Sequence, residues 1–288
     1  MKPAPFEYVA ARSVAEAVDA LARHGDEAKV LAGGQSLVPM LNMRLARPAV
    51  LVDINGAGEL DYLREASGVL AVGALLRQRT LERWARAGAP LIAEALRWVG
   101  HVAIRNRGTV AGSIAHGDPA SELPALLLCF DGAVVARRAG GERVIPAAEL
   151  HLAPLTTSLG PGELVTEVRV PLPRPEAGWG FAEVARRHGD FALVGAAAVL
   201  WCAEGRVAGA RLAFFGVGGR PLRGTAAEAA LTGREPTPAR LKDAARAAAA
   251  ALSPDADLHA TADYRRRVAA VLAERTLVEA LGRCGRGR

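Results

Sequence analysis

The spacing of apolar residues predicts alternating helices and strands at the start of the chain. Ser13 and Glu16 form a capping box, and apolar residues then recur every three or four positions until Gly25, as is typical of a helix. Short apolar runs at residues 29–32 and 49–54 predict two strands. The segment between them stops before a proline and predicts a helix. Together these segments form a strand–turn–helix–strand unit with glycines at its turn.

The rest of the chain continues this alternation. Apolar runs predict strands at residues 68–76, 132–138, 163–171, 191–202 and 206–218, and helical spacing predicts helices within residues 80–100, 237–252 and 261–281. A short turn joins the last two strands, so we expect an antiparallel hairpin there. Residues 171–180 are rich in proline and glycine and predict a linker, and the tail 282–288 is expected to be disordered.

Length and composition indicate a globular protein of two or three domains. The chain has 288 residues, of which 51% are hydrophobic, so it can bury a substantial core. No run reaches the roughly 18 apolar residues that a membrane span needs. The N-terminus has no apolar signal core, so we expect a cytoplasmic protein.

Charge and cysteine content exclude two classes of site. The net charge is +6, but the arginines are dispersed and aromatic residues make up only 5%, so no nucleic-acid partner is predicted. Cys129, Cys202 and Cys284 lie far apart in sequence, and none belongs to a C-x-x-C pair. We therefore expect no zinc site or iron–sulfur cluster built from this chain alone, and we expect the first two thiols to be buried.

The glycine turn "AGGQS", residues 32–36, is the first candidate site. Its small residues allow backbone N–H groups to converge on an anion, Ser36 adds a hydroxyl, and the following helix adds a positive end. The turn is neither a P-loop, because no lysine follows, nor a G-x-G-x-x-G motif. A phosphate cradle and an ordinary tight turn both fit this pattern.

The segment "RNRGTVAGSIAHGDPASELP", residues 105–124, is the second candidate. Its many small and polar residues are unsuited to a core but suited to wrapping a polar ligand, although a long surface loop also fits. His116 lies here without a nucleophile or carboxylate dyad, so we predict no acid–base catalyst. A third segment, "RRHGDFALVG" at residues 186–195, places an Arg–Asp pair at the entrance of a strand, where it is either structural or able to close over a ligand.

In this order and spacing, the three segments resemble the FAD-binding medium subunit of molybdenum hydroxylases, a family that includes the carbon monoxide dehydrogenase medium chain and the flavin part of xanthine dehydrogenase. The similarity covers essentially the whole chain. It implies an α+β fold with a two-part FAD-binding region of the vanillyl-alcohol-oxidase-like (PCMH) type, followed by a C-terminal domain of antiparallel sheet and helices. The implied domains are residues 1–57, 58–175 and 176–288.

The resemblance also implies where FAD binds. The first two segments are expected to hold the pyrophosphate, with Val99 along the flavin or adenine. Many relatives have a second glycine where this chain has Ala111, so we expect a negative φ there. The implied contacts are Ala32, Gly33, Gly34, Gln35, Ser36, Leu37, Val99, Thr109, Ala111, Gly112, Ser113, Asp118, Glu122, Val165 and Asp190.

The implied function is electron transfer within a complex. In this family a small iron–sulfur subunit passes electrons to FAD from a large molybdopterin subunit, and the complex is expected to be a dimer of heterotrimers. No catalytic residue or metal ligand is predicted in this chain. Two alternatives remain from the residues alone, namely a self-sufficient FAD-dependent oxidase and a non-enzymatic nucleotide-binding module. The substrate and the electron acceptor are not encoded in these motifs.

Overall fold

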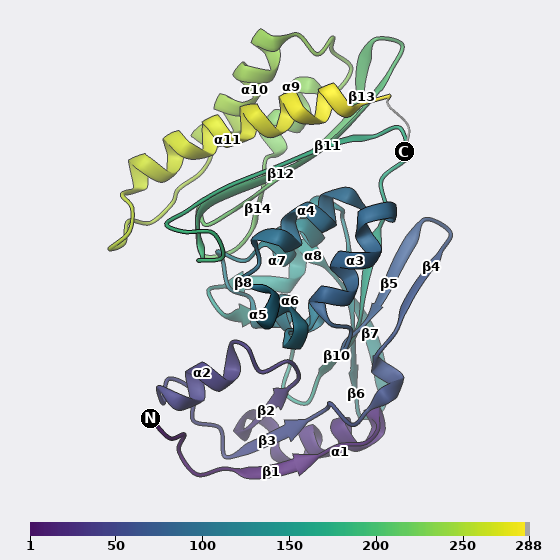
Figure 1. Ribbon diagram of the computed structural model, residues 1–288, viewed down its shortest axis with the longest axis vertical. Coiled ribbons are helices and arrows are strands. Elements are labelled where there is room, and N and C mark those ends of the chain that lie inside the picture. Colours follow the sequence, from purple (N-terminus) through teal and green to yellow (C-terminus); the bar gives the residue numbers. More distant parts are fainter. Residues whose placement is uncertain (286–288) are drawn as a thin grey trace.

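The computed structural model describes residues 1–285, arranged around three main sheets (Figure 1). The expected disorder of the tail fails in part, because Gly282 and Arg283 complete the last helix; residues 286–288 lie outside the described residues.

The first sheet is parallel and contains the N-terminal residues. Its strand order is β1-β3-β2, formed by Glu7–Ala10, Val50–Asp53 and Ala28–Leu31. Helix α1 (Val14–His24) packs on it. Ser13 caps this helix as predicted by accepting from the Glu16 N–H, while the Glu16 carboxylate accepts from the Arg12 N–H, one residue before the capping box expects. Helix α2 (Leu37–Asn42) follows the glycine turn and ends several residues earlier than expected. Strand β1 was not predicted, because it is short and mostly exposed.

The second sheet is antiparallel with the order β4-β5-β10-β6-β7. Its strands are Leu63–Ala66, Val69–Gly73, Leu164–Pro171, Ala133–Arg138 and Gly141–Pro146. Six helices accompany it: α3 (Gln78–Gly88), α4 (Pro90–Trp98), α5 (Val102–Arg107), α6 (Val110–His116), α7 (Glu122–Cys129) and α8 (Ala147–Leu150). A small hairpin of β8 (His151–Ala153) and β9 (Thr156–Thr157), together with 3-10 turns at Gly25–Glu27 and Gly58–Leu60, completes this region and the first.

The third sheet is antiparallel with the order β11-β12-β13-β14, formed by Gly178–Ala185, Ala192–Ala203, Arg206–Phe215 and Leu222–Arg223. The predicted hairpin is therefore correct. Helices α9 (Thr225–Leu231), α10 (Pro238–Ala250) and α11 (Ala262–Arg283) cover its outer face (Figure 1).

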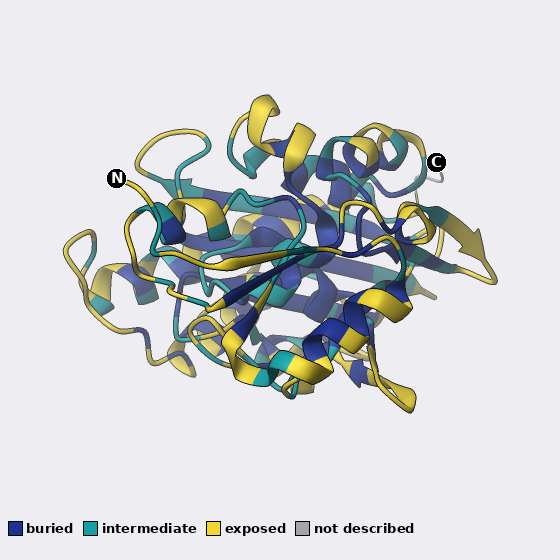
Figure 2. Ribbon diagram, turned by 90° about the horizontal axis from the view of Figure 1, so that it is seen from below, coloured by how far each residue is buried: buried dark blue, intermediate teal, exposed yellow. Residues whose placement is uncertain are grey.

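The long strand β12 is apolar throughout because both faces of the third sheet are buried. Ala197 and Val199 belong to the core shared with the first two sheets, whereas Ala198 and Leu200 belong to a second core under helices α10 and α11. Figure 2 shows the same arrangement, with buried residues along the central strands and exposed residues on the outer faces of helices. One face of the third sheet therefore packs against the first two sheets and their helices, and the other face packs against helices α10 and α11.

The glycine-rich segment 105–124 is not a surface loop. Residues 102–107 form α5, residues 110–116 form α6, and α7 begins at Glu122. Helices form here because the buried side chains Arg105, Val110 and Ile114 give each short helix an inward face. Small residues allow these helices to pack closely, which periodicity over such short pieces does not reveal.

Candidate functional site

Five consecutive backbone N–H groups are free in the turn after β2. Among the described residues, the N–H groups of Gly33 through Leu37 donate to no protein acceptor. Gly33 is nevertheless buried, and the Gln35 amide holds the turn by donating to the Gly33 carbonyl (3.0 Å). Buried donors without partners are costly, so this turn suits a ligand rich in acceptor oxygens. Ser36 makes no capping bond, which leaves its hydroxyl available as well.

The second glycine segment is the start of α6. The Thr109 hydroxyl accepts from the Gly112 N–H (3.1 Å), an N-cap bond, so the Gly112 donor is already engaged. Ala111 lies within the helix and has a negative φ, as expected, and its methyl group is buried. Within residues 1–285 its N–H has no acceptor. The second segment therefore offers fewer free donors than the first.

The tertiary fold brings the two glycine segments into direct backbone contact. A Cβ built on Gly33 would lie 2.5 Å from the Arg107 carbonyl oxygen and 2.7 Å from Gly108 Cα. A Cβ on Gly112 would lie 4.0 Å from the Ala32 Cβ. The glycine at position 33 is thus required by the meeting of two chain segments, each of which carries free donors. This geometry fits a pyrophosphate gripped from both sides.

A second group of predicted residues gathers at the end of α4. Val99 follows this helix, and the turn before β12 packs against it: a Cβ on Gly189 would lie 2.9 Å from the Gly100 carbonyl. The Trp98 and His188 rings are 5.0 Å apart in an edge-on arrangement. Asp190 lies in the same turn, paired with Arg187 at 3.1 Å. Val99 and Asp190 therefore come from distant parts of the sequence to one place.

A buried ion pair holds this end of the site, and no sequence pattern indicated it. Arg105 donates to the Val99 carbonyl (2.9 Å) and the Gly100 carbonyl (3.2 Å), and its Nε donates to Glu82 Oε2 (2.9 Å). Both side chains are buried. Hydrogen bonds from Arg79 and Arg105 lower the pKa of Glu82 despite its burial, which by itself raises it. Helix α5, six residues long, thus connects the two ends of the site.

Three carboxyl groups differ sharply in environment. Asp118 accepts from the Ala120 N–H (2.8 Å) in the loop after α6. Glu122 is buried at the start of α7, and burial raises its pKa to about 7, with a further contribution from the Asp118 charge. Glu183 on β11 was not predicted; both of its oxygens lack a partner among the described residues, and burial and the charge of Glu122 raise its pKa to about 9. A single glutamate in an otherwise apolar strand was the available signal.

Some predicted residues do not lie on these surfaces. Val165 is buried in the core at an irregularity in β10, paired with Ala136. Ser113 contacts Ser121 through their hydroxyls (3.1 Å) and so ties α6 to the start of α7. His116 is half-buried, and burial lowers its pKa while the Asp118 charge opposes this. Cys129 is buried as expected, whereas Cys202 is only half-buried.

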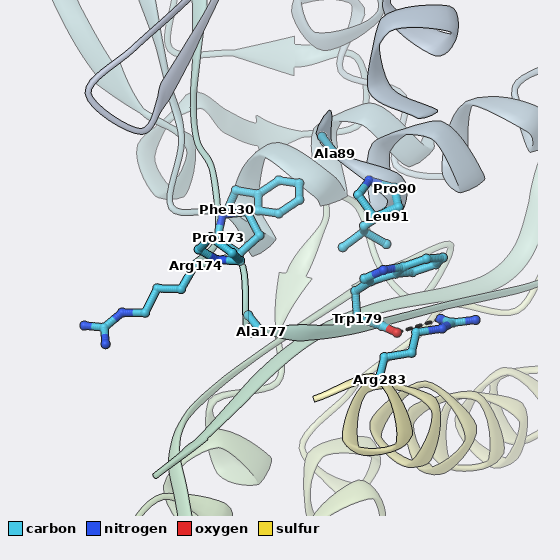
Figure 3. Close-up of a pocket in the computed structure, with 10 residues that line it drawn as sticks. Ala89, Pro90, Leu91, Phe130, Pro173, Arg174, Ala177, Trp179 and Arg283 are labelled. Atoms are coloured by element: carbon cyan, nitrogen blue, oxygen red, sulfur yellow. Dashed lines mark hydrogen bonds between the residues drawn. The ribbon is translucent and has the colours of Figure 1, made fainter. Parts of the chain in front are cut away.

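An apolar hollow in the described part of the chain lies away from the glycine segments. It has a volume of about 190 Å³ and is enclosed by the linker and by the end of α11 (Figure 3). Its lining is mainly apolar, and the Arg283 guanidinium lies over the Trp179 ring at 3.8 Å while donating to the Trp179 carbonyl. None of the predicted cofactor contacts lines it.

Residues 1–285 contain neither a candidate membrane-spanning helix nor a candidate metal site. The described helices include none long and apolar enough to cross a membrane. Within the same residues no group of three or more His, Cys, Asp or Glu side chains is placed to hold a metal ion. The fold and the site together define an α+β protein with a candidate anion-binding site where two glycine segments meet.

Comparison with known proteins identifies the family to which the chain belongs. Residues 4–173 match the family described as the FAD binding domain in molybdopterin dehydrogenase, and residues 179–280 match the CO dehydrogenase flavoprotein C-terminal domain. The chain therefore belongs to the FAD-binding family of molybdopterin dehydrogenases. Its cofactor is FAD, and the α+β fold class and the family expected from the three motifs are confirmed.

Individual relatives are similar over their full length. The 6-hydroxypseudooxynicotine dehydrogenase complex subunit alpha of Paenarthrobacter nicotinovorans is 43% identical, with 98% of this chain and 97% of that protein covered. The carbon monoxide dehydrogenase medium chain of Hydrogenophaga pseudoflava is 37% identical over 99% and 100% of the two chains. A solved carbon monoxide dehydrogenase from the same organism superposes with a TM-score of 0.96 at 39% identity, covering 99% of this chain and 100% of that one.

Proposed function

We propose that this chain is the FAD-carrying, electron-transferring medium subunit of a molybdenum hydroxylase complex. It receives electrons from a small iron–sulfur subunit, which a large molybdopterin subunit feeds, and passes them to an acceptor. The observation that carries this proposal is the contact of the two glycine segments, where Gly33 meets Arg107 and Gly108 with free N–H groups alongside. Membership in the FAD-binding family supports it.

The proposed FAD site combines the two groups of residues described above. The first turn and the start of α6 bind the pyrophosphate, and the residues around Val99 and Asp190 receive the ring end. The loop after α6, which carries Asp118, contacts the end of β13, because the Gly216 N–H donates to the Pro119 carbonyl (2.8 Å). The proposed contacts are Ala32, Gly33, Gly34, Gln35, Ser36, Leu37, Val99, Thr109, Ala111, Gly112, Ser113, Asp118, Glu122, Asp190 and Val165, the last of which is buried.

The residues of this chain bind and orient rather than react. Bound FAD supplies the redox chemistry, because its ring system accepts and releases electrons. The free N–H groups of Gly33–Leu37 neutralise pyrophosphate charge without a counterion, and Arg105 fixes the backbone at Val99 and Gly100. Glu183 holds a proton at neutral pH, so its buried site carries no negative charge beside Glu122.

The proposed partners are a small two-cluster iron–sulfur subunit and a large molybdopterin subunit, most simply as a dimer of heterotrimers in the cytoplasm. Relatives named for 6-hydroxypseudooxynicotine, caffeine and carbon monoxide dehydrogenases share this chain's architecture at 37–43% identity. Because similar subunits carry names with such different substrates, we propose that substrate choice lies on another subunit of the complex. We also propose that residues 1–57, 58–175 and 176–288 act as three structural units.

The test is the spectrum and turnover of the isolated chain. We expect purified chain reconstituted with FAD to show a flavin band near 450 nm that dithionite bleaches, and to leave aldehydes and N-heterocycles unoxidised. A chain that never takes up flavin contradicts the proposal. Steady turnover of an organic substrate by the flavin-loaded chain favours the self-sufficient oxidase, and uptake of a nucleotide but no flavin favours the nucleotide-binding module.

A further inference from the structure

A chain of hydrogen bonds through the side chains of Asn55 and Arg77 joins the two glycine segments. The Asn55 side-chain amide donates to the Ala32 carbonyl (2.8 Å), immediately before Gly33. Arg77 donates through one Nη to Asn55 Oδ1 (2.8 Å) and through the other Nη to the Arg107 carbonyl (2.6 Å), immediately before Gly108. Two side chains thus connect one carbonyl from each half of the site.

The amide of Asn55 is fixed in one orientation. Its Nδ2 also donates to Asp53 Oδ1 (2.6 Å), which accepts the Asn55 backbone N–H as well (2.8 Å). Tyr8 donates to the other Asp53 oxygen (2.5 Å). These bonds lower the pKa of Asp53 although burial opposes them, so the anchor is ionised at neutral pH. With both Nδ2 protons used, Oδ1 of Asn55 faces Arg77.

These hydrogen bonds orient the backbone N–H groups that follow the two bonded carbonyls. A carbonyl drawn toward Asn55 or Arg77 sets the orientation of the following peptide plane, because the peptide unit is planar. The planes concerned are Ala32–Gly33 and Arg107–Gly108, and each places the next N–H on the side opposite its carbonyl. The first of these is the free N–H of buried Gly33, whereas the second, the Gly108 N–H, donates to the Ile104 carbonyl (2.7 Å).

We propose that Asn55 and Arg77 are positioning residues for FAD, forming a clamp that holds the two halves of the pyrophosphate site at their binding distance before the cofactor arrives. This inference rests on the proposed function, since it assigns residues to the same site. The clamp lowers the entropy that binding must remove, because both halves are already ordered. None of the three sequence motifs includes either residue.

Arginine is required at position 77 because its fork reaches two acceptors in different directions. A lysine ammonium at the end of a flexible stem does not reproduce this geometry. Arg77 is half-buried at the start of α3, where burial and the neighbouring charge of Arg107 lower its pKa while Asp61 and Asp53 raise it. A lysine at position 77 therefore keeps the positive charge but cannot bond both Asn55 and the Arg107 carbonyl.

The test compares FAD affinity and amide hydrogen exchange in the full-length chain and in Asn55→Ala, Arg77→Ala, Arg77→Lys and Asn55→Ala/Arg77→Ala. Arg83→Ala, an exposed arginine on the same helix, is the matched control. We expect each bridge variant to weaken FAD binding about ten- to hundredfold, the size typical of losing a charged hydrogen bond. The double variant is expected to bind FAD no more weakly than the single variant with the lower affinity. Both side chains belong to one hydrogen-bonded bridge, so removing either one already breaks it. Far-ultraviolet circular dichroism checks that all variants are folded.

Exchange is measured on FAD-free protein, so it tests the clamp apart from the flavin function. We expect faster deuterium uptake across residues 107–113 in the bridge variants and no change in Arg83→Ala. Equal uptake in every folded variant overturns the clamp, whatever the flavin titration gives. If the unchanged chain binds FAD and the bridge variants bind it equally well, the clamp fails and the proposed function stands. If the unchanged chain never binds FAD, the proposed function fails.

Discussion

At the scale of single residues, the site depends on two glycines, Gly33 and Gly112, whose positions leave no room for a side chain. Gly33 has no Cβ, and the space where one would lie is filled by the backbone of Arg107 and Gly108. Gly112 is constrained differently, because a Cβ there would lie 2.5 Å from the Thr109 hydroxyl that caps α6. Replacing Gly33 therefore causes a collision with backbone atoms, whereas replacing Gly112 disrupts the N-cap of α6.

Gly33→Ala is expected to abolish FAD retention. The added methyl group meets backbone atoms at 2.5 and 2.7 Å, which cannot rotate away, so the two segments must separate. Gly33→Val and Gly112→Val are expected to do the same. Flavin per chain after gel filtration is the measurement. Gly58→Ala, whose new methyl group meets nothing within 4 Å, is the control, and full occupancy in Gly33→Ala would contradict the assignment.

Glu183→Gln is expected to stabilise the chain increasingly as pH rises from 5 to 8. The folded pKa of about 9 lies above the ordinary value of 4.5, so unfolding releases a proton between these values and the wild-type free energy of unfolding falls with pH. Glutamine removes that loss, which amounts to at most about 1.4 kcal/mol per pH unit. Urea unfolding at pH 5, 6.5 and 8 measures the difference.

The exposed Glu149→Gln serves as the control for this titration, since its side chain lies in solvent on α8. We expect the difference between this control and the wild type to stay constant with pH. A stability gain in Glu183→Gln that is the same at all three pH values would show that Glu183 is ionised in the folded chain.

At the scale of elements, the last helix lies directly on a strand. Helix α11 packs against β11, and a Cβ on Gly180 would lie 2.7 Å from Thr276 Cα and closer still to the Thr276 carbonyl oxygen. A Cβ on Gly178 would lie 2.7 Å from the Cys284 backbone nitrogen. Two strand glycines therefore set the helix-to-sheet distance. Arg265 secures the other end of the helix by donating to the Gly216 carbonyl (2.8 Å) and to Asp257 (2.6 Å).

Gly180→Ala is expected to lower the free energy of unfolding by about 1–3 kcal/mol, the usual cost of overpacking. The helix must move away from β11, since the obstructing atoms belong to its own backbone. Gly282→Ala on α11 is the matched change, because its methyl group meets nothing within 4 Å, and it is expected to stabilise by about 0.5–1 kcal/mol through helix propensity. Equal effects in chemical unfolding would contradict this packing.

At the scale of the whole molecule, the ring end of the proposed FAD site lies beside a surface suited to a partner. The turn before β12 exposes Phe191, which is 70% exposed, and Arg187. His101 and Val102 on the neighbouring segment are also exposed. Electrons must enter or leave near the ring, so a partner subunit has to approach this edge. Aromatic and arginine side chains are favoured at interfaces.

Affinity purification of the tagged chain from its native host is expected to recover a small iron–sulfur protein and a large molybdenum protein. Phe191→Asp is expected to weaken this association by placing a charge at the interface, while the isolated variant keeps its thermal midpoint, because the ring is exposed. Leu258→Asp, a fully exposed position elsewhere, is the control. Recovery of this chain alone under conditions that preserve weak complexes would contradict the subunit assignment.

Local patterns were sufficient for the elements whose own residues determine them. The Ser13 N-cap begins α1, the apolar runs form β12 and β13, and the glycine turn follows β2, all as predicted. Motif order was also sufficient for the family. These features depend on neighbours within a few positions, which the sequence displays directly. The proposed FAD contacts stay predictions.

Only the tertiary structure decided which distant residues meet. It turned most of residues 105–124 into short helices, because burial of Arg105 and Ile114 outweighed a glycine-rich composition. It placed the backbone of Arg107 against Gly33 and linked both through Asn55 and Arg77. The carboxyl of Glu183 became uncharged for the same reason, since burial is a property of the packed molecule. Contacts between residues tens of positions apart leave no periodic trace in a single sequence, and packing alone creates them.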